Sequence, residues 1–170
     1  MMLMSAAQWN LRLEHEYEAM CHFPFNNLFS WKIAPGQRAP RVKAYIVTYY
    51  VKTAINEVGN IRPQNKTEVL ITLSDSPDAA PTVKIIGGKV PYLPNIFTSG
   101  KFCLGTMWAA EPHIWMLVIN IGRILALDSV RTNPGSPANS NAALDWNNKT
   151  TQLYKFRPRN NINFPHPVGY

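Results

Sequence analysis

Four stretches with the composition of β-strands follow one another between residues 27 and 86. They cover residues 27–34, 42–52, 67–74 and 82–86, and they are rich in aromatic and β-branched side chains. The connections "PGQRAP" and "NEVGNIRPQN" contain glycines, prolines and asparagines, which favour turns. Because strands joined by short turns pair in antiparallel fashion, we expect a four-stranded antiparallel meander.

The segment before the meander, residues 5–20, predicts a helix. Ser5 and Gln8 fit a capping box, in which each side chain bonds the backbone N–H of the other residue. One apolar stripe at helical spacing would face the core: Trp9, Leu13, Tyr17 and Met20. The charged residues of the segment would face water: Arg12, Glu14, His15, Glu16 and Glu18.

The regular pattern stops in residues 87–113. Glycines and prolines interrupt this stretch at Gly87, Gly88, Pro91, Pro94, Gly100, Gly105 and Pro112. Its many aromatic and aliphatic residues argue against disorder. Since long irregular segments inside compact domains are usually functional, we expect a packed loop that carries a site, with Cys103 in its middle.

Residues 114–127, "IWMLVINIGRILAL", predict a buried helix, and residues 131–146 predict a turn-rich loop that returns to a short helix. From residue 147 the chain has four basic residues and no acidic one. We therefore divide it into an α+β domain, residues 1–146, and a basic, Pro/Asn-rich tail, residues 147–170. The extended tail would attract an acidic partner through Lys149, Lys155, Arg157 and Arg159. Alternatively, it would pack on the domain through Tyr154, Phe156 and Phe164.

The composition limits the classes of partner. A net charge of +7 favours an acidic partner. The lysines and arginines are scattered, however, and are not interleaved with aromatic residues as in a platform for stacking bases. Nucleic acid is therefore not the expected partner. The hydrophobic fraction of 46% is enough for the core of one domain.

Two cysteines, Cys21 and Cys103, form no CxxC motif and have no histidine pair at zinc spacing, so no metal site is expected. The opening "MMLMSAAQWN" lacks the basic residues of a signal peptide. The longest apolar run contains Asn120 and Arg123 and is too short to span a bilayer. We expect a cytoplasmic protein with reduced thiols and no membrane contact.

The stretch "LPNIFTSGKFCL" resembles the active-site signature of the ubiquitin-conjugating enzyme family. In that signature His-Pro-Asn precedes a hydrophobic residue, a short glycine-containing turn, a second hydrophobic residue and the catalytic cysteine, which Leu follows. Here Asn95 stands eight residues before Cys103, as in the signature, and Leu93 replaces the histidine. That histidine mainly braces the loop, and Leu93 would brace it by packing.

Further motifs that resemble the family occur in the family's order. They are "RLEHEY" in the first helix, "NNLFSWKI" in the first strand, Trp108 after the active site and "NPGSPANSNAA" in the loop that gates the cysteine. The resemblance covers residues 5–146. It implies a ubiquitin-conjugating-enzyme-like α+β fold, with an N-terminal helix, a four-stranded meander, an irregular active-site segment and a crossing helix.

Three departures from the family pattern concern partner contacts. An aromatic residue that contacts ligases is missing near Asp78, and the second ligase-contact loop reads Ala109, Ala110 and Glu111. The basic tail replaces the family's long C-terminal helices. These departures imply a divergent member, from a bacterial ubiquitin-like conjugation system of the kind found in antiphage defence operons.

The resemblance implies an acyl transferase that uses no cofactor. Cys103 would accept a ubiquitin-like modifier as a thioester from an activating enzyme and pass it to an amine of a target protein. Asn95 would stabilise the oxyanion or shape the loop. Ser136, in the gating loop, would orient the incoming amine. His113 would either accept a proton near the thiol or be structural.

Two alternatives to this function are a catalytically inactive variant that binds ubiquitin-like proteins and an α+β domain that binds nucleic acid through its tail. A reducible adduct on Cys103 would exclude the first, and binding that does not fall steeply with salt would exclude the second. A thiol protease is disfavoured, because no Cys-His-Asn order is present.

Overall fold

A computed structural model describes residues 4–75, 79–105, 107–110, 113–132, 135 and 137–170. The chain begins with helix α1 (Ala6–Cys21). Six strands follow: β1 (Phe29–Ile33), β2 (Ala44–Tyr49), β3 (Thr53–Glu57), β4 (Asn60–Gln64), β5 (Thr67–Thr72) and β6 (Thr82–Gly87). The remaining elements are helical: α2 (Met107–Ala110), α3 (Ile114–Leu125), α4 (Ser140–Asn147) and α5 (Gln152–Phe156).

Four strands form one antiparallel sheet in the order β1-β2-β5-β6, which confirms the expected meander. Strands β3 and β4 form a separate hairpin between β2 and β5, where we predicted the end of a long strand and a turn. The hairpin turns at Val58 and Gly59, whose φ angles are 50° and 84°. Left-handed angles suit a two-residue hairpin, but a β-branched residue rarely adopts them. The sequence therefore indicated a turn in this stretch, but the valine concealed the two-residue hairpin and its two strands.

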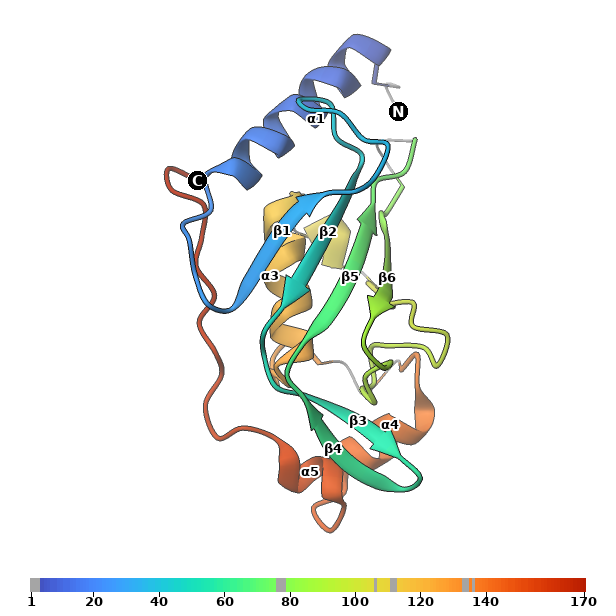
Figure 1. Ribbon diagram of the computed structural model, residues 1–170. Coiled ribbons are helices and arrows are strands. Elements are labelled where there is room, and N and C mark those ends of the chain that lie inside the picture. The colour runs from blue at the N-terminus through green and yellow to red at the C-terminus, as the bar shows by residue number, and fades with distance from the viewer. Residues whose placement is uncertain (1–3, 76–78, 106, 111–112, 133–134, 136) are drawn as a thin grey trace.

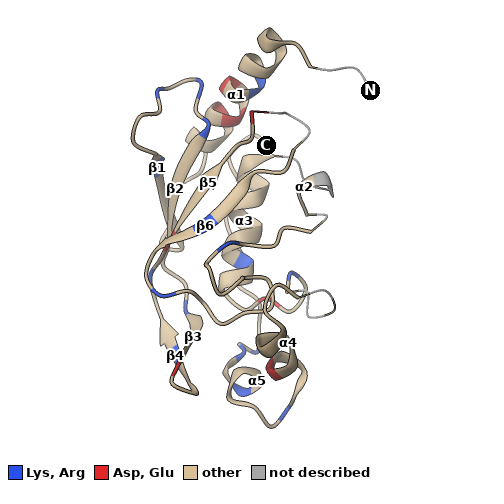
Figure 2. Ribbon diagram, turned by 90° about the vertical axis from the view of Figure 1, so that its right-hand side faces the viewer, with Lys and Arg blue, Asp and Glu red and all other residues tan. Residues whose placement is uncertain are grey.

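Helix α3 covers one face of the sheet, and α1 crosses its upper end (Figure 1; Figure 2). The sheet residues that face α3 are buried, among them Tyr45, Val47, Tyr49, Val69, Ile71 and Val83. The hydroxyl of Tyr49 donates to the carbonyl of Val118 in α3 at 2.6 Å. The apolar sequence of residues 114–127 thus forms the predicted buried helix, because both the sheet and the C-terminal segment enclose it.

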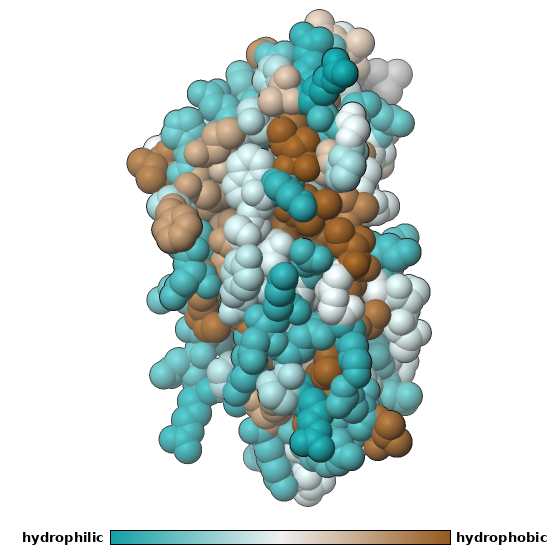
Figure 3. Space-filling model, in the orientation of Figure 1, coloured by the Kyte–Doolittle hydropathy of each residue, from teal (hydrophilic) through white to brown (hydrophobic). Residues whose placement is uncertain are grey.

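The other face of the sheet is directed toward solvent. Ile46 and Leu70 are half-buried partners across β2 and β5, and Ile86 on β6 is exposed. Figure 3 shows apolar side chains gathered over the upper half of this view and mainly hydrophilic ones below. The alternation of buried and exposed residues along each strand is what an antiparallel sheet with one covered face requires.

Helix α1 starts as predicted, with Ser5 as N-cap and the complete capping box to Gln8. Leu13 and Met20 are buried, whereas Trp9 and Tyr17 are half-buried. The prediction that Glu16 faces water was wrong, because its carboxylate is turned onto the start of α3 and only 4% of the residue is exposed. The helical repeat alone could not show that contact, since its partner lies far along the chain.

The C-terminal segment runs from α5 along the β1 side of the molecule to the end of α1 (Figure 1). There the N–H of Val168 donates to the carbonyl of His22 at 2.9 Å. Phe164 is buried and stacks on Phe29. A Cβ on Gly122 would lie 2.5 Å from the Phe164 ring, so α3 needs glycine there. The segment thus packs on the domain, and it includes a short helix, α5, that the sequence did not predict.

Candidate active site

Residues 95–103 form a tight hairpin that returns Cys103 to Asn95. The backbone N–H of Cys103 donates to the carbonyl of Asn95 at 2.8 Å, and an isolated antiparallel bridge lies inside the hairpin. Gly100 adopts a φ of 90° near its tip, a left-handed angle that glycine takes without strain. The eight-residue spacing read from the sequence therefore places the backbones of the two residues opposite each other.

The thiol of Cys103 is free, and the residue is half-buried. Access to solvent is one requirement for a nucleophilic cysteine, and a polar neighbour is another. Cys21, the other cysteine, is free and exposed at the end of α1. The two cysteines thus form no disulfide in this structure.

Asn95 is only 6% exposed, and its Nδ2 donates to the backbone carbonyl of Arg131 at 3.5 Å. A buried amide needs such partners, because an unsatisfied polar group costs about 1–3 kcal/mol. The side chain of Asn95 therefore connects the active-site segment with the segment that follows α3.

Asp128 fixes the turn that presents the Arg131 carbonyl. Its buried carboxylate accepts from Nε of Arg123 at 2.7 Å and from the backbone N–H groups of Val130 and Arg131 at 2.8 and 3.3 Å. This role of Asp128 was not predicted from the sequence. An aspartate just after an apolar helix that ends with an arginine would have been the signal.

Leu93 and Pro94 anchor the active-site segment to the core and to the start of α4. Leu93, which stands at the position of the signature histidine, is fully buried in the core. The carbonyl of Pro94 accepts from the N–H groups of Ala138 and Asn139, at 2.8 and 3.2 Å. Asn139 is also the N-cap of α4. The start of α4 is thus bonded directly to the residue before Asn95.

Several predicted residues lie outside the described part of the chain. Ser136, the predicted amine-orienting residue, is one of them, and Asp78 and Glu111 are two more. Ala138, two residues after Ser136, contacts the active-site segment through Pro94. The assignment of Ser136 stays a prediction from the sequence.

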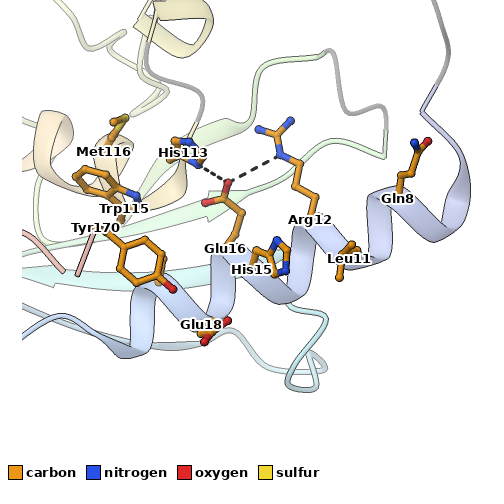
Figure 4. A pocket seen from close by; sticks show the side chains of 11 residues that line it. Gln8, Leu11, Arg12, His15, Glu16, Glu18, His113, Trp115, Met116 and Tyr170 are labelled. Atoms are coloured by element: carbon orange, nitrogen blue, oxygen red, sulfur yellow. Dashed lines mark hydrogen bonds and ion pairs between the residues drawn. The ribbon is translucent and has the colours of Figure 1, made fainter. Parts of the chain in front are cut away.

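His113 contacts α1 through a buried carboxylate. Its Nδ1 lies 2.9 Å from Oε1 of Glu16, whose Oε2 accepts from the backbone N–H of Ile114 at 2.8 Å (Figure 4). Glu16 therefore accepts a hydrogen bond from the N–H of Ile114, which has no partner within α3. Its negative charge also complements the positive end of the helix dipole. Nε of Arg12 lies 3.9 Å from the same carboxylate. This contact favours the structural alternative for His113.

A hollow of about 770 Å³ lies beside this carboxylate, between α1, the start of α3 and Tyr170. Its wall is mainly apolar and includes Leu11, Trp115, Met116 and Tyr170 (Figure 4). None of the residues that line it belongs to the hairpin of Asn95 and Cys103. The hollow is therefore separate from the candidate active site.

Within the described residues, no group of three or more His, Cys, Asp and Glu side chains is placed to hold a metal ion. The hairpin supplies a free thiol at Cys103 and a buried amide at Asn95. That set suits nucleophilic acyl transfer, which needs an accessible thiol and a hydrogen-bond donor for the oxyanion.

No protein-family model and no curated protein matches the sequence. Solved structures do match the fold. The crystal structure of a putative ubiquitin-conjugating enzyme from Plasmodium yoelii superposes with a TM-score of 0.56 and 17% identity, over 89% of this chain and 92% of that one. Ubc12 of S. cerevisiae gives a TM-score of 0.56 and 19% identity, over 82% and 70% of the two chains.

A ubiquitin-conjugating enzyme domain from Toxoplasma gondii gives a TM-score of 0.52 and 20% identity, over 80% of this chain and 84% of that one. These similarities establish the fold. The chain has the fold of the ubiquitin-conjugating enzymes: an N-terminal helix, a four-stranded antiparallel sheet and helices that follow it.

Among the described residues, every helix is too short or too polar to cross a lipid bilayer.

Proposed function

We propose that this protein accepts a ubiquitin-like modifier as a thioester on Cys103 and transfers it to an amine of a target protein. One observation carries the proposal. Within the fold of the conjugating enzymes, a hairpin bonds the backbone of Cys103 to that of Asn95 at 2.8 Å. This is the pair of residues that the sequence signature assigns to catalysis.

In the first step the thiolate of Cys103 attacks the thioester carbonyl that joins the modifier to an activating enzyme. A new carbon–sulfur bond forms, the old one breaks, and the activating enzyme's cysteine leaves as a thiolate. In the second step a target amine attacks the new thioester. The tetrahedral oxyanion collapses, the Cys103 thiolate leaves, and the amine nitrogen gives its proton to solvent or to a nearby base.

Asn95 serves the second step in this proposal. Its amide donates to the oxyanion or keeps the hairpin in shape, and removing one oxyanion donor slows comparable enzymes by about 100- to 1,000-fold. Burial supports a fixed amide, because 6% exposure leaves it little freedom to move. Ser136 would orient the incoming amine.

The partners in this proposal are a ubiquitin-like modifier, an activating enzyme and a target protein. The setting that we propose is the cytoplasm, in a bacterial conjugation system that acts in antiphage defence. The net charge of +7 favours acidic surfaces on at least one of these partners.

Non-reducing electrophoresis tests the proposal. The protein is incubated with ATP and with activating enzymes and modifiers of the ubiquitin type, including pairs encoded beside its own gene. We expect a higher-mass band that thiol reductant removes. If a modifier binds tightly but no pair yields a band, the protein is a binding module for ubiquitin-like proteins instead.

A further inference from the structure

Tyr92 and Asp145 join the active-site segment to α4 through their side chains. The phenol of Tyr92 donates to Oδ2 of Asp145 at 2.8 Å, in a partly buried position. The two residues are 53 positions apart in the chain. Hydrogen bonds to a charged acceptor are stronger than neutral ones. This bond therefore stabilises the contact between two elements that are distant in the sequence.

The backbone of each partner makes a further hydrogen bond to another part of the chain. The backbone N–H of Tyr92 donates to the carbonyl of Ala54 in β3 at 2.8 Å. The backbone carbonyl of Asp145 accepts from the hydroxyl of Thr151 at 2.5 Å. The backbones of both residues are therefore tied to other parts of the chain. The distance between the active-site segment and α4 is therefore set at this point.

The phenol remains a donor throughout the physiological pH range. Burial, and then the hydrogen bond to Asp145, raise the pKa of Tyr92 to about 12. A second contact between the same two elements lies two residues along, where the Pro94 carbonyl accepts from Ala138 and Asn139. The side-chain contact and the backbone contact therefore flank one short stretch of chain.

That short stretch leads directly to the candidate catalytic residues. Asn95 follows Pro94, and its carbonyl accepts from the N–H of Cys103. A shift of residues 92–94 relative to α4 would therefore move the Asn95 amide and the backbone of Cys103 together. Small displacements matter here, because a misplacement of about 1 Å can cost about 100-fold in rate.

We propose that Tyr92 and Asp145 are a positioning pair, which holds α4 against the active-site segment and thereby fixes Asn95 beside Cys103. Neither residue is proposed to touch the reacting atoms. The structural part of the proposal stands on the contacts alone, and its catalytic part rests on the proposed thioester transfer.

The test compares Tyr92→Phe, Asp145→Ala and the double variant with wild type. Asp145→Asn keeps an oxygen acceptor and serves as the conservative variant. Tyr49→Phe is the matched control, because it also removes one tyrosine hydroxyl hydrogen bond, to Val118 in the core. Two quantities are measured: amide hydrogen exchange at Ala138 and Asn139, and the rate at which charged protein discharges onto a lysine solution.

We expect exchange at Ala138 and Asn139 to rise by about tenfold in Tyr92→Phe and in Asp145→Ala, the factor that corresponds to losing one such hydrogen bond. The double variant should match the single ones, and Asp145→Asn should lie near wild type. Discharge should slow in the same variants, while charging stays close to the wild-type rate. Tyr49→Phe should leave the discharge rate unchanged. It should also leave exchange at Ala138 and Asn139 unchanged relative to exchange in the rest of the protein.

The positioning proposal is overturned if exchange in Tyr92→Phe equals that in Tyr49→Phe, or if the two single variants add in the double. It is also overturned if charged Tyr92→Phe discharges at the wild-type rate. If wild type forms no thioester at all, the proposed function fails, and the exchange measurement still decides whether the pair positions the segment.

Discussion

Two residues, Cys103 and Asn95, carry the proposed chemistry, and the backbone hydrogen bond between them ties their positions. Cys103 is half-buried and free. The exposed Cys21 is the natural comparison, since it is also a free thiol but lies at the end of α1. The proposed reaction therefore makes opposite predictions for the two cysteines.

Cys103→Ala should abolish the reducible adduct with the modifier, because no other thiol occupies the hairpin. Cys21→Ser should leave the adduct at its wild-type level. Both are checked by non-reducing electrophoresis, with circular dichroism to show that each variant folds. An adduct that survives in Cys103→Ala would disprove the assignment of the nucleophile.

Asn95→Ala should still accept the modifier but discharge it onto an amine about 100- to 1,000-fold more slowly, if the amide stabilises the oxyanion. Single-turnover discharge of the purified thioester measures this. Asn56→Ala is the control, because it removes the hydrogen bond that the Asn56 side chain accepts from the N–H of Gly59 in the β3–β4 turn. Equal discharge by both variants would leave Asn95 with no catalytic role.

Among the secondary-structure elements, α1 and α3 share an apolar core and are also joined by one buried carboxylate, that of Glu16. Glu16 accepts from the first backbone N–H of α3 and from His113. The N-cap residue His113 makes no capping hydrogen bond with its own side chain. A residue from another helix therefore takes the place of a local cap.

Glu16→Ala should lower the free energy of unfolding by about 1–3 kcal/mol, because the Ile114 N–H would lose its partner inside the protein. Urea denaturation measures this. Glu18→Ala is the control, since Glu18 is exposed on the same helix, and surface substitutions usually change stability by less than about 0.5 kcal/mol. Equal effects from both would show that the cap contributes nothing.

At the scale of the whole molecule, the C-terminal segment spans the protein from α5 to the end of α1 (Figure 1). The segment is basic, but Arg157 lies with its guanidinium 4.1 Å from the Trp146 ring centroid, and Phe164 is buried. These contacts favour the packing role over the electrostatic role that the sequence also allowed. Lys149, Lys155 and Arg159 remain exposed and can still act on a partner.

Phe164→Ala should destabilise the protein by about 3–5 kcal/mol, the usual cost of removing a buried phenylalanine. Charging should then slow equally at low and high salt. The triple variant Lys149→Gln, Lys155→Gln, Arg159→Gln should keep the melting temperature of the wild type, because the three side chains are exposed. If the triple variant charges more slowly only at low salt, the tail also attracts a partner electrostatically.

The stability of the fold should also respond to alkaline pH. Burial raises the pKa of Tyr45 and Tyr49 above their ordinary value of 10.0, and burial with Asp145 raises that of Tyr92 to about 12. A raised pKa stabilises the protonated folded form, so this contribution is complete below pH 10 and is lost as pH rises toward and beyond 12. Urea midpoints between pH 8 and 12 should therefore fall above pH 10, and less steeply in Tyr92→Phe.

The sequence by itself determined the features that depend on neighbouring residues. The capping box at Ser5, the strand pattern of the meander and the spacing of Asn95 and Cys103 all involve residues a few positions apart. Local geometry of this kind follows from backbone and side-chain preferences. The first helix, the meander and the eight-residue spacing could therefore be predicted from local patterns, and the resemblance to a family supplied the specific fold and the assignment of Asn95 and Cys103. The hairpin that joins these two residues was not predicted, and Ser136 lies outside the described residues.

The tertiary structure decided the features that join distant parts of the chain. Glu16 meets His113 across 97 positions, and Tyr92 meets Asp145 across 53. A buried polar group must find a partner, but its identity depends on which elements pack together. The side of α1 on which Glu16 lies, the insertion of the β3–β4 hairpin and the path of the C-terminal segment were all decided by packing, which no local pattern records.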